Sequence, residues 1–210
     1  MSGTKEIAER INRCRKVYSN SKKHDIVLWR QIDRFLEDMC KKFPAHKNVK
    51  EVIVKVTAID RLYRAMLYRG RQDYHKIATG LRDSDIDKVL RQINGLLSIK
   101  NLPQVLEATK IVAGLGNPKK PRYWVFASKY LHFHKPKLFP LFDKNAKDKC
   151  NALCRRLGLT NEYLNSMNEY EAFCRQLLSL QKVLVHKTRC KASLSDLDKF
   201  LYGEQYLKRV

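Results

Sequence analysis

Lys129 and Asp143 are the two residues in this chain whose types and spacing best suit chemistry. Lys129 lies in FASKYLHFH, an apolar and aromatic stretch, and Asp143 follows fourteen positions later at the end of FPLFD. An amine in an apolar site loses its proton more readily and can act as a nucleophile. A carboxylate stabilises positive charge that develops on a reacting group. Two purely structural roles remain open: Lys129 extends to solvent, and Asp143 only caps a helix.

The segment between these two residues is able to bring them together. A helix from Lys129 to Pro136 rises roughly 10 Å. Seven extended residues can then return about 23 Å. Pro136 and Pro140 favour a packed, irregular segment over a strand at 137–142. We therefore expect a reversal at Pro136 and a new helix after Asp143.

The rest of the chain predicts an all-α fold. Apolar residues recur three and four positions apart almost throughout, and 210 residues suit one compact domain spanning 1–210. In 48–68 an apolar stripe consists of Val52, Val56, Ile59, Tyr63 and Met66, whereas the residues on other faces are Lys55, Asp60, Arg61 and Arg64. The other expected helices are 4–18, 26–42, 85–98, 102–112, 121–134, 144–157, 168–185 and 194–207, with Asp25, Ser84, Asp143 and Ser193 available as caps.

The charge of the chain indicates a polyanionic partner. Lys and Arg number 43 against 21 Asp and Glu, which leaves a formal charge of +22 spread along the sequence. Nucleic acid is the first candidate, and an anionic membrane surface is the rival. No apolar stretch is long enough to span a bilayer, and the N-terminal sequence lacks a signal-peptide core. We expect an intracellular protein, of the cytoplasm and nucleoid or of the nucleus, with no membrane partner.

Cysteine and histidine spacings give no support to a metal centre. The six cysteines are scattered without CxxC pairs, which favours reduced thiols that fill the core. Cys150 and Cys154 lack the spacing of an iron–sulfur cluster. His132 and His134 point to different sides of a helix and cannot form an i, i+4 ligand pair, so we interpret them as polar edges of a pocket or DNA surface.

A glycine-rich turn precedes the lysine helix. In AGLGN, Gly114 and Gly116 flank Leu115, so the backbone can turn tightly and leave amide N–H groups accessible. Such amides and the following helix start can hold a phosphate. Charge beside them comes from Lys119, Lys120 and Arg122. The alternative is that Gly114 merely ends one helix and Pro121 starts the next.

These motifs together resemble the helix-hairpin-helix DNA glycosylase superfamily. The turn VAGLG stands where that superfamily has LPGVG, and FPLFD stands where it has its VPVD-type aspartate. FASK and the compact FPLFD are similar to the 8-oxoguanine DNA glycosylase branch. The motif covers about 101–146. The resemblance implies an all-α fold, either as one body or as two helical lobes with the active site between them.

The resemblance also implies an activity: excision of a damaged base, such as 8-oxoguanine, from duplex DNA, with Schiff-base AP-lyase activity as a further expectation. Lys129 would attack the sugar C1′ and Asp143 would stabilise the cationic sugar. Ala113 and Asn117-Pro118 depart from the usual hairpin, which leaves Lys119 and Lys120 as alternative nucleophiles.

A flipped base needs aromatic faces to grip it. The candidates for this base pocket are Tyr123, Trp124 and Phe133. No cofactor, metal or obligate protein partner is expected, and the protein is expected to be a monomer. The competing hypothesis is a noncatalytic, basic nucleic-acid-binding protein on the same scaffold.

Overall fold

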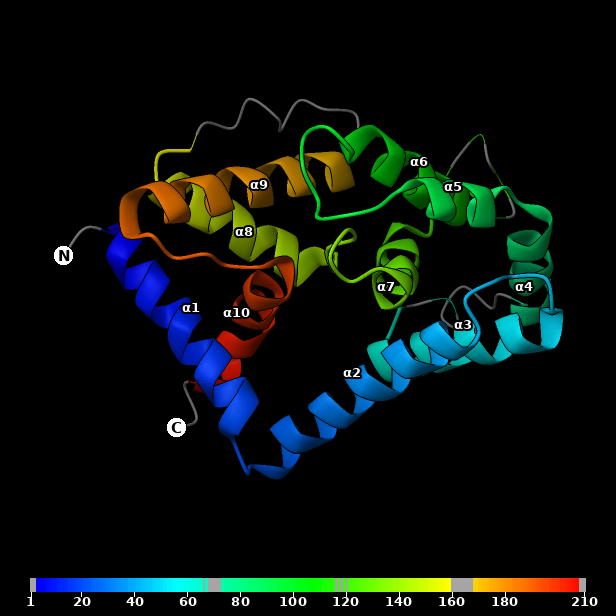
Figure 1. The fold of residues 1–210 in the computed structure, drawn as a ribbon, viewed down its shortest axis with the longest axis horizontal. Helices are drawn as coiled ribbons and strands as arrows, with labels where there is room; N and C mark the ends of the chain where they lie inside the picture. Colours follow the sequence, from blue (N-terminus) through cyan, green and yellow to red (C-terminus); the bar gives the residue numbers. More distant parts are fainter. Residues whose placement is uncertain are drawn as a thin grey trace. The chain divides into compact units, whose positions relative to one another are not determined.

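The computed structural model describes residues 3–65, 67, 73–115, 117, 119, 121–159 and 168–207, with side chains to 203. Within them the chain forms ten α-helices and no strand (Figure 1). The prediction of an all-α fold is therefore confirmed. No described helix combines the length and the apolar character needed to cross a membrane.

The chain divides into two compact units. The terminal unit comprises Met1–Val27 and Phe142–Val210, and the central unit comprises Leu28–Leu141. The first boundary falls within α2 (His24–Lys42), and the second falls directly after the Pro140 segment.

Four helices form the terminal unit, in which α1 packs against α9 and α10, and α8 packs against the same two helices. Apolar side chains of α1, among them Ile7 and Ile11, are fully buried, as are Leu180 and Leu197. Arg15 of α1 forms a bidentate ion pair with Asp196 of α10. The bounds of these helices are α1 Gly3–Asn20, α8 Lys144–Arg156, α9 Glu169–Thr188 and α10 Leu194–Leu207.

The central unit is built mainly from α3 to α7. Helix α3 packs against α4 and α7, and α6 packs against α5 and α7. Helix α7 is buried along nearly its whole length, from Phe126 to Phe133, which makes it the central helix of this unit. The bounds of the helices are α3 Val49–Tyr63, α4 Tyr74–Asp83, α5 Ile86–Gln92, α6 Leu102–Ala113 and α7 Trp124–His134.

Helix α3 ends five residues before its predicted end. Arg64 adopts a left-handed conformation with φ 49°, and its N–H donates to the Asp60 carbonyl oxygen, which terminates the helix after Tyr63. Helix α4 was not predicted from the sequence. It is held by Ile77, Ala78 and Leu81, which are buried.

Two charged side chains of α3 contradict the predicted surface pattern. Lys55 and Asp60 were expected away from the apolar stripe, yet both are fully buried. The Lys55 Nζ donates to the carbonyl oxygens of Phe43 and Ala45, at 2.7 and 3.2 Å. Asp60 accepts hydrogen bonds from the Leu67 N–H and the Tyr74 hydroxyl. The expectation was wrong because backbone and phenol groups supply these charges with internal partners.

The helix predicted at 85–98 ends at Gln92, but several other local predictions agree with the structure. Residues 137–142 form turns and irregular backbone, as the prolines indicated. All six cysteines are free and buried. Asp143 caps α8, and the Ser193 hydroxyl oxygen accepts a hydrogen bond from the Asp196 N–H at the start of α10. Ser84 closes α4, where its hydroxyl donates to the Leu81 carbonyl oxygen, and its oxygen also accepts a hydrogen bond from the Ile86 N–H at the start of α5.

Candidate functional site

Lys129 is buried on α7, with 6% of its surface exposed. Its neighbours along the helix, Ser128 and Tyr130, are fully buried, so the amine stem runs through the interior of the central unit. The Nζ donates a hydrogen bond to the backbone carbonyl oxygen of Tyr63 at 2.9 Å. This carbonyl belongs to the last residue of α3, where the helix leaves carbonyl oxygens without intrahelical partners. The sequence-based alternative, in which Lys129 extends to solvent, does not describe this structure.

An aromatic row lies beside the partner of Lys129. It consists of Trp29, Tyr63 and Phe133, with ring centroids 5.6 Å apart for Trp29–Tyr63 and 4.8 Å apart for Tyr63–Phe133, in edge-to-face arrangements. Phe133 is buried, whereas Trp29 and Tyr63 are half-buried. The Tyr63 hydroxyl also donates to Asp33 of α2. Half-buried aromatic faces next to a buried amine could stack on a planar, uncharged group.

Asp143 belongs to the terminal unit, whereas Lys129 belongs to the central unit. The Asp143 Oδ1 accepts a hydrogen bond from the Ala146 N–H at 3.0 Å, which caps α8. The carboxylate also lies near Tyr202 of α10: burial, together with the charges of Asp198 and Asp143, raises the pKa of Tyr202. Capping is therefore one role of Asp143, and its half-buried position is compatible with a second one.

The turn before α7 uses several of its own amides. The N–H groups of Gly114 and Leu115 donate to carbonyl oxygens of α6, and Asn117 N–H donates to Gly114. Further along, the N–H groups of Arg122 and Tyr123 both donate to the Ala113 carbonyl oxygen. Helix α7 consequently begins at Trp124, three residues after the predicted start at Pro121. Any anion bound to this turn must therefore rely on its cationic side chains and on the remaining amides.

Packing, as well as turn geometry, fixes the connection between α6 and α7. Gly114 has an ordinary φ of −88°, and Leu115 is buried. A Cβ added at Gly80 of α4 would lie 3.1 Å from the Leu115 side chain, so Gly80 permits close contact between α4 and the turn. The apolar residue between the two hairpin glycines thus anchors the turn to the body of the central unit.

The other predicted nucleic-acid and base-pocket residues are distributed along this connection. Lys119 and Arg122 are exposed, as a phosphate contact requires, while Gly116 and Lys120 lie outside the described residues. Tyr123 and Trp124 are half-buried at the start of α7. Of the three aromatic residues predicted for a base pocket, Phe133 belongs to the aromatic row.

Sequence reasoning missed a buried polar network that supports α7. His46 Nδ1 lies 2.5 Å from the Asp87 carboxylate, and His46 Nε2 lies 2.9 Å from the Tyr130 hydroxyl. The His134 ring packs at 5.1 Å from the His46 ring and 5.0 Å from the Tyr130 ring. The Lys55 ammonium lies 6.0 Å from the centroid of the Tyr130 ring.

The titration of this network follows from its burial. Burial and the Lys55 charge lower the pKa of His46 to about 4, against the opposing effect of Asp87. Burial lowers the pKa of Lys55 to about 8. Burial alone would raise the pKa of Asp87, yet its hydrogen bonds with His46 leave that pKa below its ordinary value. His46 is therefore neutral at pH 7, and its Nδ1–H donates to Asp87 while Nε2 accepts from Tyr130.

His132 also departs from the sequence interpretation. It was expected at a pocket edge or DNA surface, but it is buried, and its Nδ1 lies 2.8 Å from the Phe139 carbonyl oxygen. This contact ties the reversal after α7 back to the helix. His132 thus positions the segment that leads towards Asp143.

A family model covers most of this region. The HI_0787_N model, described as an N-terminal domain, matches residues 5–138. The chain belongs to the HI_0787_N family. Neither the curated proteins nor the solved structures contain a match to this chain.

The HI_0787_N match contains some of the candidate residues and excludes others. Lys129, the aromatic row and the connection before α7 all lie within it, whereas Asp143 lies beyond its end at 138. Tyr63 was predicted only as part of the apolar stripe of 48–68, and Trp29 was not singled out. Neither was assigned to the site, because no spacing in the sequence links them to α7.

Proposed function

We propose that this HI_0787_N protein is a DNA glycosylase that removes a damaged base, an oxidised purine such as 8-oxoguanine, from duplex DNA. The observation that carries the proposal is the Lys129 amine, buried on α7 at 2.9 Å from the Tyr63 carbonyl oxygen and adjacent to the aromatic row. The resemblance of the VAGLG, FASK and FPLFD motifs to helix-hairpin-helix glycosylases supports the same conclusion.

The reaction requires an amine nucleophile next to a flipped nucleotide. The Lys129 amine, in its deprotonated form, attacks the sugar C1′ as the glycosidic C–N bond breaks, and the base leaves with the electrons of that bond and takes up a proton. The attached nitrogen then passes one proton to the ring oxygen O4′ as the C1′–O4′ bond breaks, which gives a protonated imine at C1′ and a 4′-hydroxyl group. Loss of a C2′ proton from this imine expels the 3′ phosphate and cleaves the strand, which is the proposed AP-lyase activity.

The aromatic row supplies a surface suited to a flipped base. Trp29 and Tyr63 are half-buried, and an extruded purine stacks well on such faces. In this proposal Asp143 stabilises positive charge on the sugar, in addition to capping α8. Lys119 and Arg122 bind backbone phosphates from the exposed connection before α7.

A noncatalytic, basic nucleic-acid-binding protein is the second candidate. Two observations favour it: the formal charge of +22 needs no active site, and the amides of Gly114, Leu115 and Asn117 already donate within the turn. In that case the Lys129 hydrogen bond to Tyr63 only ties α7 to α3. Both candidate functions predict binding to nucleic acid, but only the glycosylase predicts release of a base.

A panel of duplexes tests the proposal. Each duplex contains one lesion, such as 8-oxoguanine, a uracil or an alkylated purine, opposite each of the four bases, and is assayed for free base and for strand cleavage. Glycosylase function predicts base release from at least one oxidised-purine duplex, and lyase activity predicts cleavage without added alkali. Tight binding with no base release from any duplex would support the noncatalytic candidate.

A further inference from the structure

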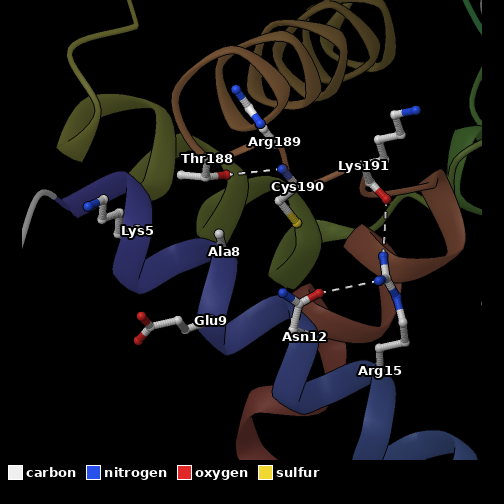
Figure 2. Close-up of a pocket in the computed structure, with 9 residues that line it drawn as sticks. All are labelled: Lys5, Ala8, Glu9, Asn12, Arg15, Thr188, Arg189, Cys190 and Lys191. Atoms are coloured by element: carbon white, nitrogen blue, oxygen red, sulfur yellow. Dashed lines mark hydrogen bonds between the residues drawn. The ribbon is translucent and has the colours of Figure 1, made fainter.

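A pocket with cationic walls lies wholly within the terminal unit. It is formed by one side of α1, from Lys5 to Arg15, and by the connection Thr188–Lys191 between α9 and α10, and its volume is about 530 Å³ (Figure 2). None of its lining residues belongs to the central unit, which holds Lys129. It is therefore a feature separate from the candidate catalytic residues.

The connection that forms one wall is held in place by Arg15. The Arg15 guanidinium pairs with Asp196 through two hydrogen bonds, of 2.9 and 2.8 Å, and also donates to the Lys191 carbonyl oxygen at 3.1 Å. Its remaining nitrogen donates to Asn12 Oδ1 at 3.2 Å (Figure 2). Arg15 therefore has a structural role: it holds the connection Thr188–Lys191 against α1 in the absence of a ligand.

Three other cations line the pocket without an acidic partner. Lys5, Arg189 and Lys191 are exposed and form no ion pair with any described residue. In Figure 2 they stand on different sides of Ala8 with their charged ends directed outwards, and the Glu9 carboxylate points away from Lys191. Three cations against the single carboxylate of Glu9, with Arg15 already paired to Asp196, give the pocket a positive potential that favours an anion.

Two of these three positions hold residues that the local structure disfavours. Lys5 stands in the first turn of α1, where the helix dipole disfavours a cation. Arg189 adopts a left-handed conformation with φ 57°, at a helix-ending position usually occupied by glycine. A residue other than glycine is strained there by roughly 1 kcal/mol or more. A bound anion would offset the charge of Lys5 at the start of α1, and contact with that anion would account for an arginine at a position that favours glycine.

We propose that this pocket binds a phosphate group through Lys5, Arg189 and Lys191. Phosphate is a compact anion that accepts several hydrogen bonds, and the three side chains can donate from different sides. The phosphate is either a backbone phosphodiester of nucleic acid or the phosphate of a small molecule. The inference is independent of base removal, because it concerns binding to a different unit of the protein.

The test compares two variants of the full chain that lose the same charge. The pocket variant is Lys5→Gln/Arg189→Gly/Lys191→Gln, in which glycine suits the left-handed position and should not reduce the melting temperature. The control variant is Lys16→Gln/Arg155→Gln/Lys182→Gln, which removes three exposed cations of the same unit outside the pocket. Single variants at Lys5 and Lys191 repeat the comparison if the triple variant melts early.

Two probes are used. Fluorescence anisotropy measures the affinity for an undamaged duplex at several salt concentrations, and NMR follows the amide signals of residues 188–192 during titration with inorganic phosphate. The pocket variant should bind duplex at least fivefold more weakly than the control, with a slope of log K against log salt reduced by about 2 to 3. Phosphate should shift the amide signals in the wild type and in the control, and not in the pocket variant.

The two probes also distinguish the sources of the phosphate. A duplex effect identifies a phosphodiester of the nucleic-acid backbone, whether or not free phosphate binds. A response to inorganic phosphate with equal duplex binding by both variants identifies a small phosphorylated ligand. Equal duplex binding together with no pocket-dependent phosphate shift would overturn the proposal. None of these outcomes depends on whether the protein releases a base, so failure here leaves the glycosylase proposal separately testable.

Discussion

The Nζ of Lys129 on α7 donates to the backbone carbonyl oxygen of Tyr63, the last residue of α3, at 2.9 Å and across 66 positions of the sequence. This contact joins the helix that carries the candidate nucleophile to the helix that carries the central ring of the aromatic row. One residue thus has both a structural role and a proposed chemical one, and the two can be separated by substitution.

The structural role predicts a loss of stability in Lys129→Met. Methionine fills the apolar path of the stem but leaves the Tyr63 carbonyl without this donor, which should lower the free energy of unfolding by about 1.5–3 kcal/mol. Lys129→Gln should lose less, because its amide can still donate. Urea denaturation measures both, with the exposed Lys119→Met as a control that stays within roughly 0.5 kcal/mol of wild type. Equal stability of Lys129→Met and wild type would show that the contact contributes nothing.

Two substitutions at Asp143 separate its capping of α8 from the proposed effect of its negative charge on the sugar. Asp143→Asn keeps an oxygen that accepts from the Ala146 N–H, so stability should change little, whereas Asp143→Ala should cost about 1 kcal/mol as the cap is lost. Base release by Asp143→Asn should nevertheless slow by roughly a hundredfold or more, because the developing charge on the sugar loses its carboxylate. Single-turnover kinetics on a lesion duplex provide the rate. If the Asn variant keeps the full rate, Asp143 is only a cap.

Acid should destabilise the protein before its carboxylates are protonated. The folded pKa of His46 is about 4, below the unfolded value near 6.5, so the unfolded state takes up a proton that the folded state refuses. The stabilisation is fully present above pH 6.5 and is lost as pH falls towards 4, by up to about 3 kcal/mol from His46. His134 acts in the same direction, since burial, Lys55 and His46 lower its pKa.

Urea unfolding at pH 7.5, 6, 5 and 4.5 measures this loss. The groups facing His46 are Asp87 of α5, Lys55 of α3, and Tyr130 and His134 of α7. Asp196 titrates lower: burial raises its pKa, but hydrogen bonds from Arg15 and Ser193 reduce it to about 2, so its contribution is lost only below pH 4. The exposed His75→Gln variant should keep the wild-type slope. Unchanged stability from pH 7.5 to 4.5 would contradict a neutral His46.

Duplex binding should depend on the exposed cations before α7. Lys119→Gln/Arg122→Gln should reduce the slope of log K against log salt by about 2, since each lost phosphate contact removes roughly 0.9. The matched control is Lys88→Gln/Arg91→Gln, two exposed cations of α5 in the same unit. Anisotropy titrations from 50 to 300 mM salt, a range chosen to keep binding measurable, give the slopes. Identical slopes for both double variants would exclude a specific role for the connection.

Periodicity was sufficient to predict most helices, and the exceptions have physical causes. Helix α4 is short, and Gly80 within it weakens the helical signal, yet Gly80 is required by the approach of Leu115. The predicted range of helix α3 was too long, because the helix is ended by the left-handed conformation of Arg64, which no pattern of apolar residues indicates. Lys55 and Asp60 were placed on the surface because their partners are backbone groups and a tyrosine from other segments.

The candidate residues that could be selected from the sequence lie close together in it. Lys129, Phe133 and Asp143 could be selected from one stretch, because an apolar helix and a capped helix start are local patterns and the same stretch resembles helix-hairpin-helix glycosylases. Tyr63 and Trp29 could not, since tertiary packing alone brings them to α7. The network around His46 was missed for the same reason.

Trapping of the imine is the decisive test of the proposal that Lys129 is the nucleophile of a DNA glycosylase. The protein is incubated with an 8-oxoguanine duplex and sodium borohydride, whose hydride reduces the imine carbon to a stable amine, and the modified peptide is then identified by mass. We expect a covalent protein–DNA adduct at Lys129, which is lost in Lys129→Gln while duplex affinity is retained. An adduct at Lys119 or Lys120 would keep the enzyme class but reassign the nucleophile, and base release without an adduct would indicate hydrolysis by water. If the protein binds the duplex but gives no adduct and releases no base, the glycosylase proposal is contradicted.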